Sequence, residues 1–334
     1  MATRVRSFSK INLGLAVGPP RPDGFHGLAT VYQTLAMHDF VTVSAARANE
    51  STIILTANHP GVPCTARGNA EKNTAWRIVA GALKRLDLAA TVSIGIEKHL
   101  PIQGGMGAGS ANAAAALLGL ERELGVELSE ADQLELGAEV GSDVPLFILG
   151  GTVLGLGRGE VVSRLPDLPA KPVVIAIPEV GVSTALAFQE LDKRQQSLTF
   201  QQGTDRLEML SRALAAIWTP STAEHDSSGI ARWTGDLAED QLLALVRTGI
   251  ENDFEEVVFS QHPSLRQIKR ELVGSETNGK PLCAGLSGSG SALFGLYQSE
   301  TDARAAQQRV QQSGTRAILT ETLPRDLYWS NMFM

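Results

Sequence analysis

The glycine-rich stretch at residues 101–114 constrains the fold of this chain more than any other segment. Gly104, Gly105, Gly107 and Gly109 fall within six residues, and a backbone without Cβ atoms can approach a ligand closely and adopt positive φ. The apolar residues that follow recur at helical spacing, which predicts a helix over 109–124. Loop N–H groups and the positive end of that helix would converge on one point, which suits a phosphate. The alternative is a glycine-rich turn before a core helix.

The stretch matches neither of the two commonest nucleotide-binding signatures. No Lys-Ser or Lys-Thr pair closes it, so it is not a Walker A loop. An alternating strand at 92–96 precedes it, but no acidic residue follows at the distance typical of a dinucleotide fold. Both of those folds are therefore disfavoured.

Size and composition narrow the class of protein. The 334 residues suffice for two domains, and 43% hydrophobic content with 19% charged residues indicates a globular chain with a full core. A net charge of −7 argues against general nucleic-acid binding but leaves an anionic small substrate open. Cys64 and Cys283 are far apart in the sequence; a single disulfide between them stays open, but two isolated thiols in a chain of this size favour a reducing cytosol. No apolar run is long enough for a membrane span, and Met1 leads directly into an alternating segment. We expect no signal peptide and a cytoplasmic protein.

Local patterns predict a β-rich first half that ends at a proline-rich boundary. Turns break up strands over 4–57, including 31–35, 40–44 and 52–56. Further predicted elements are a helix at 73–86, a strand at 91–97, helices at 109–124 and 129–140, and short strands at 144–149, 152–156 and 160–165. The segment 166–172 divides the chain into predicted domains 1–166 and 167–334.

The second half mixes helices with a β-α-β ending. It opens with a strand at 173–177 and continues with predicted helices near 183–191, 205–217, 238–248, 252–260 and 263–273. Polar segments at 192–204 and 219–235 are predicted loops or insertions. The end is predicted as strands at 282–286 and 291–297, a helix at 301–312 and a strand at 315–320. We expect the tail at 329–334 to pack on its own domain.

A pair of polar residues lies before the glycine-rich stretch, and a single acidic residue lies after it. Lys10 and Asn12 share one face of the first strand, opposite Ile11, and either point into a cleft or form a solvated sheet face. Asp143 lies in a tight turn before an apolar segment. It either bonds its own backbone, as in an Asx turn, or is held as a carboxylate that can take a proton from a hydroxyl.

Two further segments are candidate ligand contacts. The second glycine loop at 286–292 suits close approach to a charged ligand, although a simple connection between strands fits equally. Phe25 and His26 follow a turn and could stack on and hydrogen-bond a planar heterocycle, with core packing of Phe25 as the alternative. None of the six histidines has metal-ligand spacing, so no metal site is predicted from side chains.

Taken in order, these segments resemble the GHMP kinase superfamily. The local sequences resemble the branch that acts on a cytidine-diphosphate-linked methylerythritol. They are FSKINLGLAV, RPDGFHGLATVYQ, KNTAWRIVA, GSDVPLFILGGTVLGLGRGE and ENDFEEVVFSQHPSLRQIKREL. The matches run from residue 6 to about 297 with a gap at 192–248. The resemblance implies a two-domain α+β fold, with an N-terminal domain similar to ribosomal protein S5 domain 2 and a ferredoxin-like C-terminal domain.

The resemblance also implies an ATP-dependent kinase that phosphorylates the 2-hydroxyl of that small-molecule substrate, an isoprenoid precursor. Asp143 would accept the hydroxyl proton and Lys10 would stabilise the developing charge. His26 would bind the cytosine, with Phe25 and Tyr32 as aromatic faces, while Asn12 would place the methylerythritol. Ser287 and Gly288 would close over phosphate. ATP, with bridging Mg²⁺, would bind Pro101, Gly104, Gly105, Gly107, Gly109, Ser110, Ala111 and Asn112. We expect a monomer or weak homodimer with no nucleic-acid or membrane partner.

Several residues depart from the family pattern. Phe25 stands where tyrosine is usual, which keeps a stacking face and loses a hydroxyl. Residues that replace commoner choices in or before the first loop are Gln103, Met106, Ala108, Ala111, Thr74 and Ala75. Two other functions stay open. One is a GHMP kinase for another alcohol, such as a sugar, homoserine or a mevalonate-type compound, and the other is a non-catalytic ligand-binding homologue.

Overall fold

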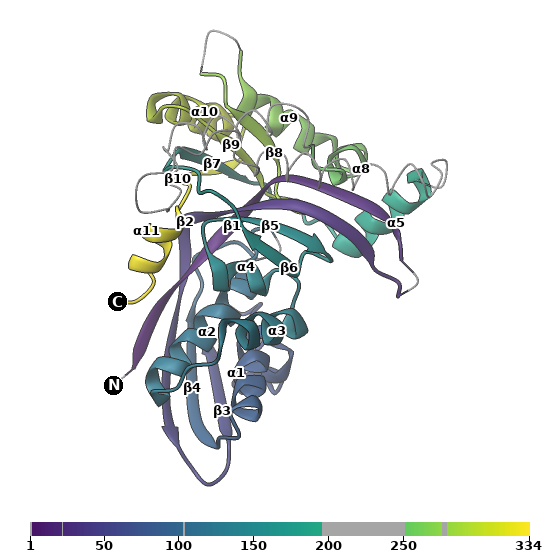
Figure 1. Ribbon diagram of the computed structural model, residues 1–334. Helices are drawn as coiled ribbons and strands as arrows, with labels where there is room; N and C mark the ends of the chain where they lie inside the picture. The colour runs from purple at the N-terminus through teal and green to yellow at the C-terminus, as the bar shows by residue number, and fades with distance from the viewer. Residues whose placement is uncertain (1, 22, 103, 196–250, 276–278) are drawn as a thin grey trace, which may run out of the picture.

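The computed structural model describes residues 2–21, 23–102, 104–195, 251–275 and 279–334. Figure 1 shows two sheets, one above the other, with the long strands β1 and β2 running between them. The first sheet has the order β3-β4-β2-β5-β6, and β1 pairs with β2. Its strands are β1 Thr3–Pro20, β2 His26–Arg47, β3 Thr52–Ala57, β4 Ala90–Glu97, β5 Thr152–Gly157 and β6 Val161–Arg164.

Helices cover one face of this sheet and complete the N-terminal core. They are the short 3₁₀ helices η1 Thr65–Arg67 and η2 Ala70–Lys72, and α1 Thr74–Arg85, α2 Ala108–Leu124, α3 Glu130–Val140 and α4 Val144–Leu149. Asn73 and Ser129 cap α1 and α3 through their side chains, as their residue types favour. The predicted helices at 73–86, 109–124 and 129–140 are confirmed within one or two residues.

The two strands predicted at 31–35 and 40–44 are one continuous strand, β2. The β1–β2 register steps from Phe8 opposite His38 to Ser9 opposite Leu35. The residues between the two predicted strands therefore form a bulge rather than a turn. The segment contains no glycine or proline that would end the strand.

The strand predicted at 144–149 is wrong, because these residues form α4. All six side chains are buried, and a continuous apolar run of this length does not separate a buried helix from a buried strand by periodicity. Pro145 in the first turn is compatible with a helix start. Asp143 occupies the N-cap position of this helix.

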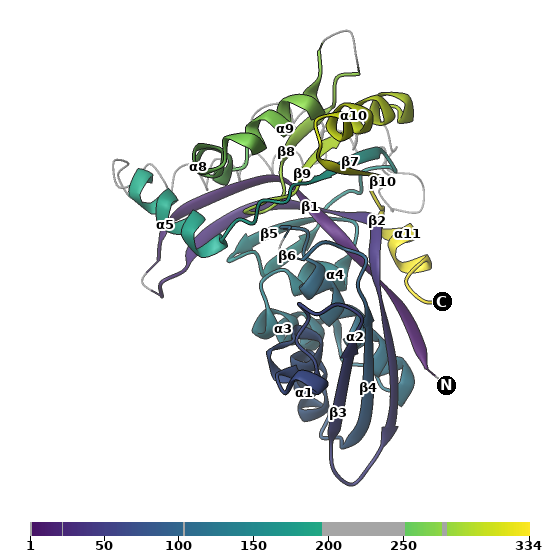
Figure 2. The ribbon, with the colours of Figure 1, turned by 180° about the vertical axis from the view of Figure 1, so that it is seen from behind.

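The C-terminal half forms an antiparallel sheet with the order β10-β7-β9-β8. Helices connect each inner strand to an edge strand, β7 to β8 and β9 to β10. This strand order with these connections is that of a ferredoxin-like domain. Its elements are β7 Pro172–Ile177, α5 Thr184–Gln195, α8 Phe254–Gln261, α9 Pro263–Val273, β8 Cys283–Leu286, β9 Leu293–Leu296, α10 Glu300–Gln312 and β10 Arg316–Glu321. The helices α8, α9 and α10 lie on the side of the sheet away from β1 and β2 (Figures 1 and 2).

Some predictions fall outside the described residues. These are the helices at 205–217 and 238–248, the loop at 219–235, most of the loop at 192–204, and Gln103. Within the described part, residues 192–195 are the last turn of α5 rather than a loop. The predicted boundary at 166/167 falls between β6 and β7.

The C-terminal tail packs on the opposite domain from the one expected. Helix α11, Arg325–Ser330, follows β10 and returns to the N-terminal core beside α4. The Tyr328 hydroxyl donates to the Phe147 carbonyl at 2.5 Å, and Trp329 Nε1 donates to the Leu149 carbonyl at 3.2 Å. These two carbonyls lie in the last turn of a helix, where intrahelical donors are lacking. Among the described helices, none is both long and apolar enough to cross a membrane.

Candidate active site

The first glycine loop leads into the N-terminus of α2 through residues that must be glycine. Gly107 has φ +70° at the N-cap, and no side chain caps this end of the helix. A Cβ on Gly107 would lie 2.8 Å from the Phe147 ring, and one on Gly105 would lie 2.0 Å from the Ser287 carbonyl oxygen. The loop is therefore packed against neighbouring groups on one side while its helix end stays open to a ligand.

The loop lines a cavity of about 380 Å³. Of the residues predicted to bind nucleotide, Pro101, Gly104, Gly105, Gly107, Gly109, Ser110 and Asn112 line it. Ala111 does not, because it is 2% exposed and packs in the N-terminal core. Sequence reasoning missed Lys72, Thr74 and Lys98, which also line the cavity.

A buried ion pair fixes the start of this loop. Asp39 accepts hydrogen bonds from the backbone N–H groups of His99 at 2.7 Å and Leu100 at 2.8 Å through Oδ1. Its Oδ2 accepts from Lys98 Nζ at 2.6 Å, and the two side chains are 0% and 4% exposed. No local pattern predicted this pair, since the partners are 59 residues apart.

Lys10 and Asp143 come together, as predicted. Lys10 Nζ lies 3.3 Å from Asp143 Oδ2 and donates to Asn12 Oδ1 at 2.7 Å. Asn12 in turn donates to Thr30 Oγ1 at 2.7 Å. Lys10 and Asn12 are each 3% exposed, so this face of β1 is not a solvated sheet surface.

The Asp143 carboxylate is available for chemistry rather than used in its own turn. It makes no side-chain cap bond although it stands at the N-cap of α4, so the Asx-turn interpretation is wrong. The Tyr32 hydroxyl donates to its Oδ1 at 3.0 Å. Burial raises the pKa of Tyr32 well above the usual value, and the neighbouring Asp143 charge raises it further.

A second cavity, of about 580 Å³, lies on the far side of Lys10 and Asp143. The predicted residues Asn12, Phe25, His26, Tyr32 and Gly288 line it with that pair. Sequence reasoning missed Arg158, Phe188 and Asp192, which also line it. This cavity shares Gly105 and Gly107 with the cavity of the glycine loop, so the two spaces meet at these glycines.

Aromatic rings gather at the outer end of this cavity. His26 stacks on Phe188 with ring centroids 4.7 Å apart, and its Nε2 lies 2.7 Å from Asp192 Oδ1. Phe25 is 50% exposed, and the Arg158 guanidinium lies 4.9 Å from its ring centroid. Tyr32 differs from expectation, because its ring is 2% exposed and leaves no free face for a heterocycle to stack on.

The second glycine loop packs against the first across the domain boundary. Ser287 Oγ donates to the Gly105 carbonyl at 3.0 Å, so this predicted ligand hydroxyl is already engaged. Asn252, which sequence reasoning missed, donates through Nδ2 to the carbonyls of Leu286 at 2.8 Å and Gly288 at 2.7 Å. A 6% exposed asparagine therefore sets the path of this loop.

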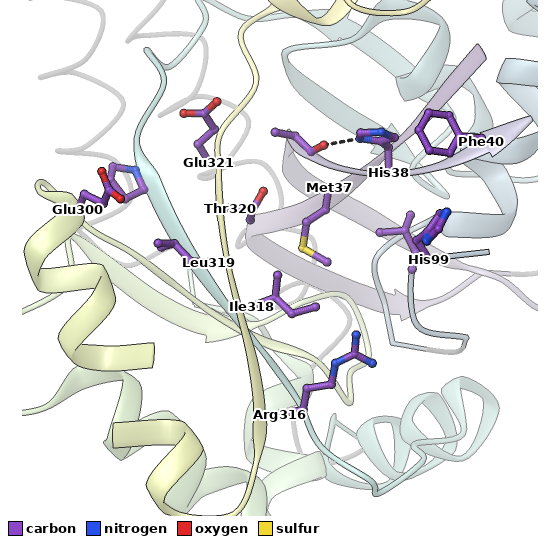
Figure 3. Close-up of a pocket in the computed structure, with 13 residues that line it drawn as sticks. Met37, His38, Phe40, His99, Glu300, Arg316, Ile318, Leu319, Thr320 and Glu321 are labelled. Carbon is purple, nitrogen blue, oxygen red and sulfur yellow. Dashed lines mark hydrogen bonds between the residues drawn. The ribbon is translucent and has the colours of Figure 1, made fainter. Parts of the chain in front are cut away.

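A larger cavity of about 760 Å³ lies elsewhere, beside the β10 strand. Figure 3 shows Met37 and Ile318 within it, with His38, His99 and Arg316 along its walls. Glu300 and Glu321 also line it. None of the residues predicted to act belongs to it, so we place the active site at the two cavities that meet beside Lys10.

The arrangement at those two cavities suits transfer of a charged group to a hydroxyl. An open helix N-terminus is able to hold an anion on one side. A carboxylate paired with an ammonium group faces the other side, where it can accept a proton from an alcohol. Among the described residues, no group of three His, Cys, Asp or Glu side chains is placed to hold a metal ion.

Comparison with known proteins agrees with this geometry. The family described as GHMP kinases N terminal domain matches residues 73–151, and GHMP kinases C terminal matches residues 235–316. A 4-diphosphocytidyl-2-C-methyl-D-erythritol kinase from Solibacter usitatus (strain Ellin6076) is 35% identical over 88% of this chain and 81% of its own. The enzyme of the same name from Caldicellulosiruptor saccharolyticus is 31% identical over 97% of this chain and 98% of its own.

A solved structure extends the likeness to the fold. A crystal structure of 4-(cytidine 5'-diphospho)-2C-methyl-D-erythritol kinase superposes with a TM-score of 0.66 at 25% identity. It covers 96% of this chain and 98% of that one. The predicted two-domain α+β fold is thereby confirmed.

Proposed function

The chain belongs to the GHMP kinase family, and from this premise we propose that it transfers a phosphoryl group from ATP to the 2-hydroxyl of 4-diphosphocytidyl-2-C-methyl-D-erythritol. Membership makes it an ATP-dependent small-molecule kinase. The substrate is the one named for its relatives at 31–35% identity. The product would be the 2-phosphate, an isoprenoid precursor, together with ADP.

One observation supports this function above the others: the Lys10–Asp143 pair lies where the two cavities meet. Lys10 Cγ is 3.1 Å from where a Cβ on Gly107 would stand, and Gly107 lines both cavities. A nucleotide with its phosphates at the α2 N-terminus and an alcohol in the larger cavity would thus meet at this pair. In phosphoryl transfer, positioning and electrostatic stabilisation supply most of the catalysis.

The proposed chemistry uses Asp143 as the general base. The substrate hydroxyl oxygen bonds to the γ-phosphorus as the bond from that phosphorus to the ADP oxygen breaks, and the hydroxyl proton passes to the Asp143 carboxylate. Lys10 pairs with the carboxylate at 3.3 Å and stabilises charge that develops on the transferred group. Asn12 orients the ammonium group through the 2.7 Å hydrogen bond described above.

ATP fits the glycine-loop cavity, because the loop glycines and the first residues of α2 line it, and no side chain caps that end of the helix. Mg²⁺ is proposed to arrive with the phosphates, since it commonly keeps several waters and needs few protein ligands. Ser110, which lines the cavity and lies beside the turn at Gly141, would offer its hydroxyl oxygen to the ion. When bound, Mg²⁺ would neutralise charge on the phosphates.

The larger cavity supplies groups for the rest of the substrate. Phe25 and Phe188 offer aromatic surface for a cytosine, and His26, which stacks on Phe188, offers a hydrogen-bonding edge in the same cavity. Arg158 is the guanidinium among the lining residues, and it suits the diphosphate because its planar fork matches phosphate oxygens. Gly288, next to Ser289, borders the same space. We further propose a cytoplasmic enzyme that is a monomer or weak homodimer.

The test measures ADP release with Mg-ATP and 4-diphosphocytidyl-2-C-methyl-D-erythritol for the wild type and Asp143→Asn. Loss of a general base should lower kcat by about 100- to 10,000-fold, while calorimetry shows that ATP still binds. Asp87→Asn is the matched control, because Asp87 is exposed in the turn after α1 and its variant should keep wild-type turnover. A folded, ATP-binding wild type that leaves this substrate unphosphorylated would refute the assignment and direct the search to other alcohols.

A further inference from the structure

Tyr32 makes a contact that no local sequence pattern explains. Its ring is buried in the N-terminal sheet, where β2 places it opposite Asn12 of β1 and Val153 of β5. The hydroxyl at the end of the ring reaches out of the sheet and donates to Asp143 Oδ1 at 3.0 Å. A buried residue of the sheet thus touches the carboxylate proposed to act as the base.

The two oxygens of the Asp143 carboxylate have two different partners. Tyr32 binds Oδ1, and the Lys10 ammonium lies 3.3 Å from Oδ2. The side chain makes no cap bond to its own helix. The orientation of the carboxylate therefore depends on contacts from β1 and β2, and each oxygen keeps a lone pair for the substrate proton.

The surrounding backbone fixes the position of the Tyr32 hydroxyl. A Cβ on Gly159 would lie 2.5 Å from Tyr32 Oη, and one on Gly155 would lie 2.5 Å from Cε2 of the ring. Both glycines belong to β5 and the turn that follows it, so close backbone packing holds the ring on this side. A donor that is held in place in this way loses little entropy when it orients its acceptor.

The hydroxyl is a donor throughout the working pH range. Burial and the charge of Asp143 both raise the pKa of Tyr32, so it does not compete with Asp143 for the proton of the substrate. Several ionisable groups surround this contact. Lys10 of β1 and Tyr32 of β2 touch Asp143, the charge of Glu160 in the turn after β5 also acts on Tyr32, and the same cavity is lined by Arg158, His26 and Asp192.

We propose that Tyr32 is a positioning residue for phosphoryl transfer, which holds the Asp143 carboxylate in the orientation that accepts the proton of the substrate. The inference rests on the proposed function only in taking Asp143 as the base. It predicts a defect in the chemical step rather than in substrate binding, because the hydrogen bond of the hydroxyl goes to an enzyme group, the Asp143 carboxylate.

The test compares wild type, Tyr32→Phe and Tyr297→Phe by kcat, KM and the pH profile of kcat. Tyr32→Phe should lower kcat by about 10- to 100-fold, the effect of one hydrogen bond to a charged group, and change the substrate KM by less than about twofold. A hydrogen bond to the ionised form favours that form, so its loss should move the acidic limb of the profile upward by about 0.5–1 pH unit. Tyr297→Phe also removes a buried, bonded hydroxyl, the one that donates to the Leu272 carbonyl at 2.7 Å, and should leave the rates and the profile unchanged.

Two results would overturn the proposal. Unchanged kcat and an unmoved acidic limb in Tyr32→Phe would show that the hydroxyl has no catalytic effect. A raised KM at unchanged kcat would make Tyr32 a substrate contact instead. If thermal melting shows that Tyr32→Phe is unfolded, Tyr32 is replaced by 3-fluorotyrosine, which keeps the ring and has a hydroxyl that donates more strongly. The acidic limb of the kcat profile should then move to lower pH, and an unmoved limb would refute the positioning role. If the wild type phosphorylates a different alcohol, kcat and KM of the variants relative to wild type are measured with that alcohol. The proposed substrate can then be wrong while the positioning role of Tyr32 is still tested.

Discussion

Removing the Asp39 carboxylate should destabilise the protein more than any exposed charge change. The Lys98 side chain is 4% exposed, and its ammonium group lies 2.6 Å from the Asp39 carboxylate. Asp39→Ala therefore leaves this buried charge without its partner. It also leaves the backbone N–H groups of His99 and Leu100 without an acceptor. Removing one member of a buried pair typically costs about 3–5 kcal/mol, which is a large share of the ~5–15 kcal/mol stability of a domain.

A double-mutant cycle isolates the contribution of the pair. Lys98→Met should cost less, about 1–2 kcal/mol, because Asp39 keeps its two backbone donors. The double variant should lose at least about 1 kcal/mol less than the sum of the single losses, since no buried charge is left unpaired. The assay is urea unfolding with the midpoint and slope fitted together.

The neighbouring exposed pair provides the control. Arg4 and Glu97 lie 3.0 Å apart with side chains 38% and 48% exposed, so Glu97→Gln should cost less than about 1 kcal/mol. The KM for ATP should rise in Asp39→Ala, because the start of the glycine loop loses its anchor. A loss below about 1 kcal/mol for Asp39→Ala, or strict additivity in the cycle, would refute the reasoning.

Three further predictions concern the first loop, a buried acid and the tail. Gly105→Ala should abolish most activity, because the added Cβ would lie 2.0 Å from a backbone oxygen. Gly109→Ala should keep most of it, because the nearest atom to its added Cβ is 3.7 Å away. Equal rates for the two variants would contradict the packing argument. Burial raises the pKa of Glu121 in the folded state, so as pH rises the Glu121 carboxyl loses its proton in the unfolded chain before it does so in the folded protein. The free energy of unfolding of the wild type, relative to Glu121→Gln, should therefore fall as pH rises from 4 through the raised pKa, and urea unfolding at several pH values measures this change. Deleting residues 325–334 removes buried Tyr328 and Met332 from the N-terminal core and should lower Tm by more than about 5 °C, whereas an unchanged melting curve would mean that the tail contributes nothing.

The sequence predicts those parts of the site whose signal is local. A glycine cluster before a helical pattern predicts the loop that we propose binds phosphate, since the property that matters is the absence of a Cβ at given positions. Alternation on β1 places Lys10 and Asn12 on one face. Helix caps at Asn73 and Ser129 are likewise visible, because the residue type itself supplies the bond.

The parts that were missed depend on contacts between distant segments. Tyr32 and Asp143 are 111 residues apart, and His26 and Asp192 are 166 apart. Such pairs carry no spacing that a single sequence reveals. The helix α4 was missed for another reason: its six residues are all apolar and buried, so no alternation of polar and apolar positions distinguishes the two possible structures.

Each half of the chain completes the core of the other, and this bears on how the site is assembled. The β1–β2 hairpin extends beyond the N-terminal sheet, and Leu15 and Val17 of β1 are buried in the C-terminal core. In return, Tyr328 and Met332 of the tail are buried in the N-terminal core. A cut at the predicted boundary of 166/167 would expose apolar surface on both fragments.

The two glycine loops are joined in the same way. The Ala292 N–H donates to the Gly104 carbonyl at 3.3 Å, and Asn252 bridges to Leu15 of β1 as well as holding the second loop. Lys10, Asp143 and the first loop all lie in the N-terminal half, yet the shape of the cavity between them depends on backbone atoms from the C-terminal half. The cavity beside the Lys10–Asp143 pair, which we propose as catalytic, is therefore complete only when both halves are folded together, and the hairpin and the tail that cross between the halves in opposite directions hold them in that arrangement.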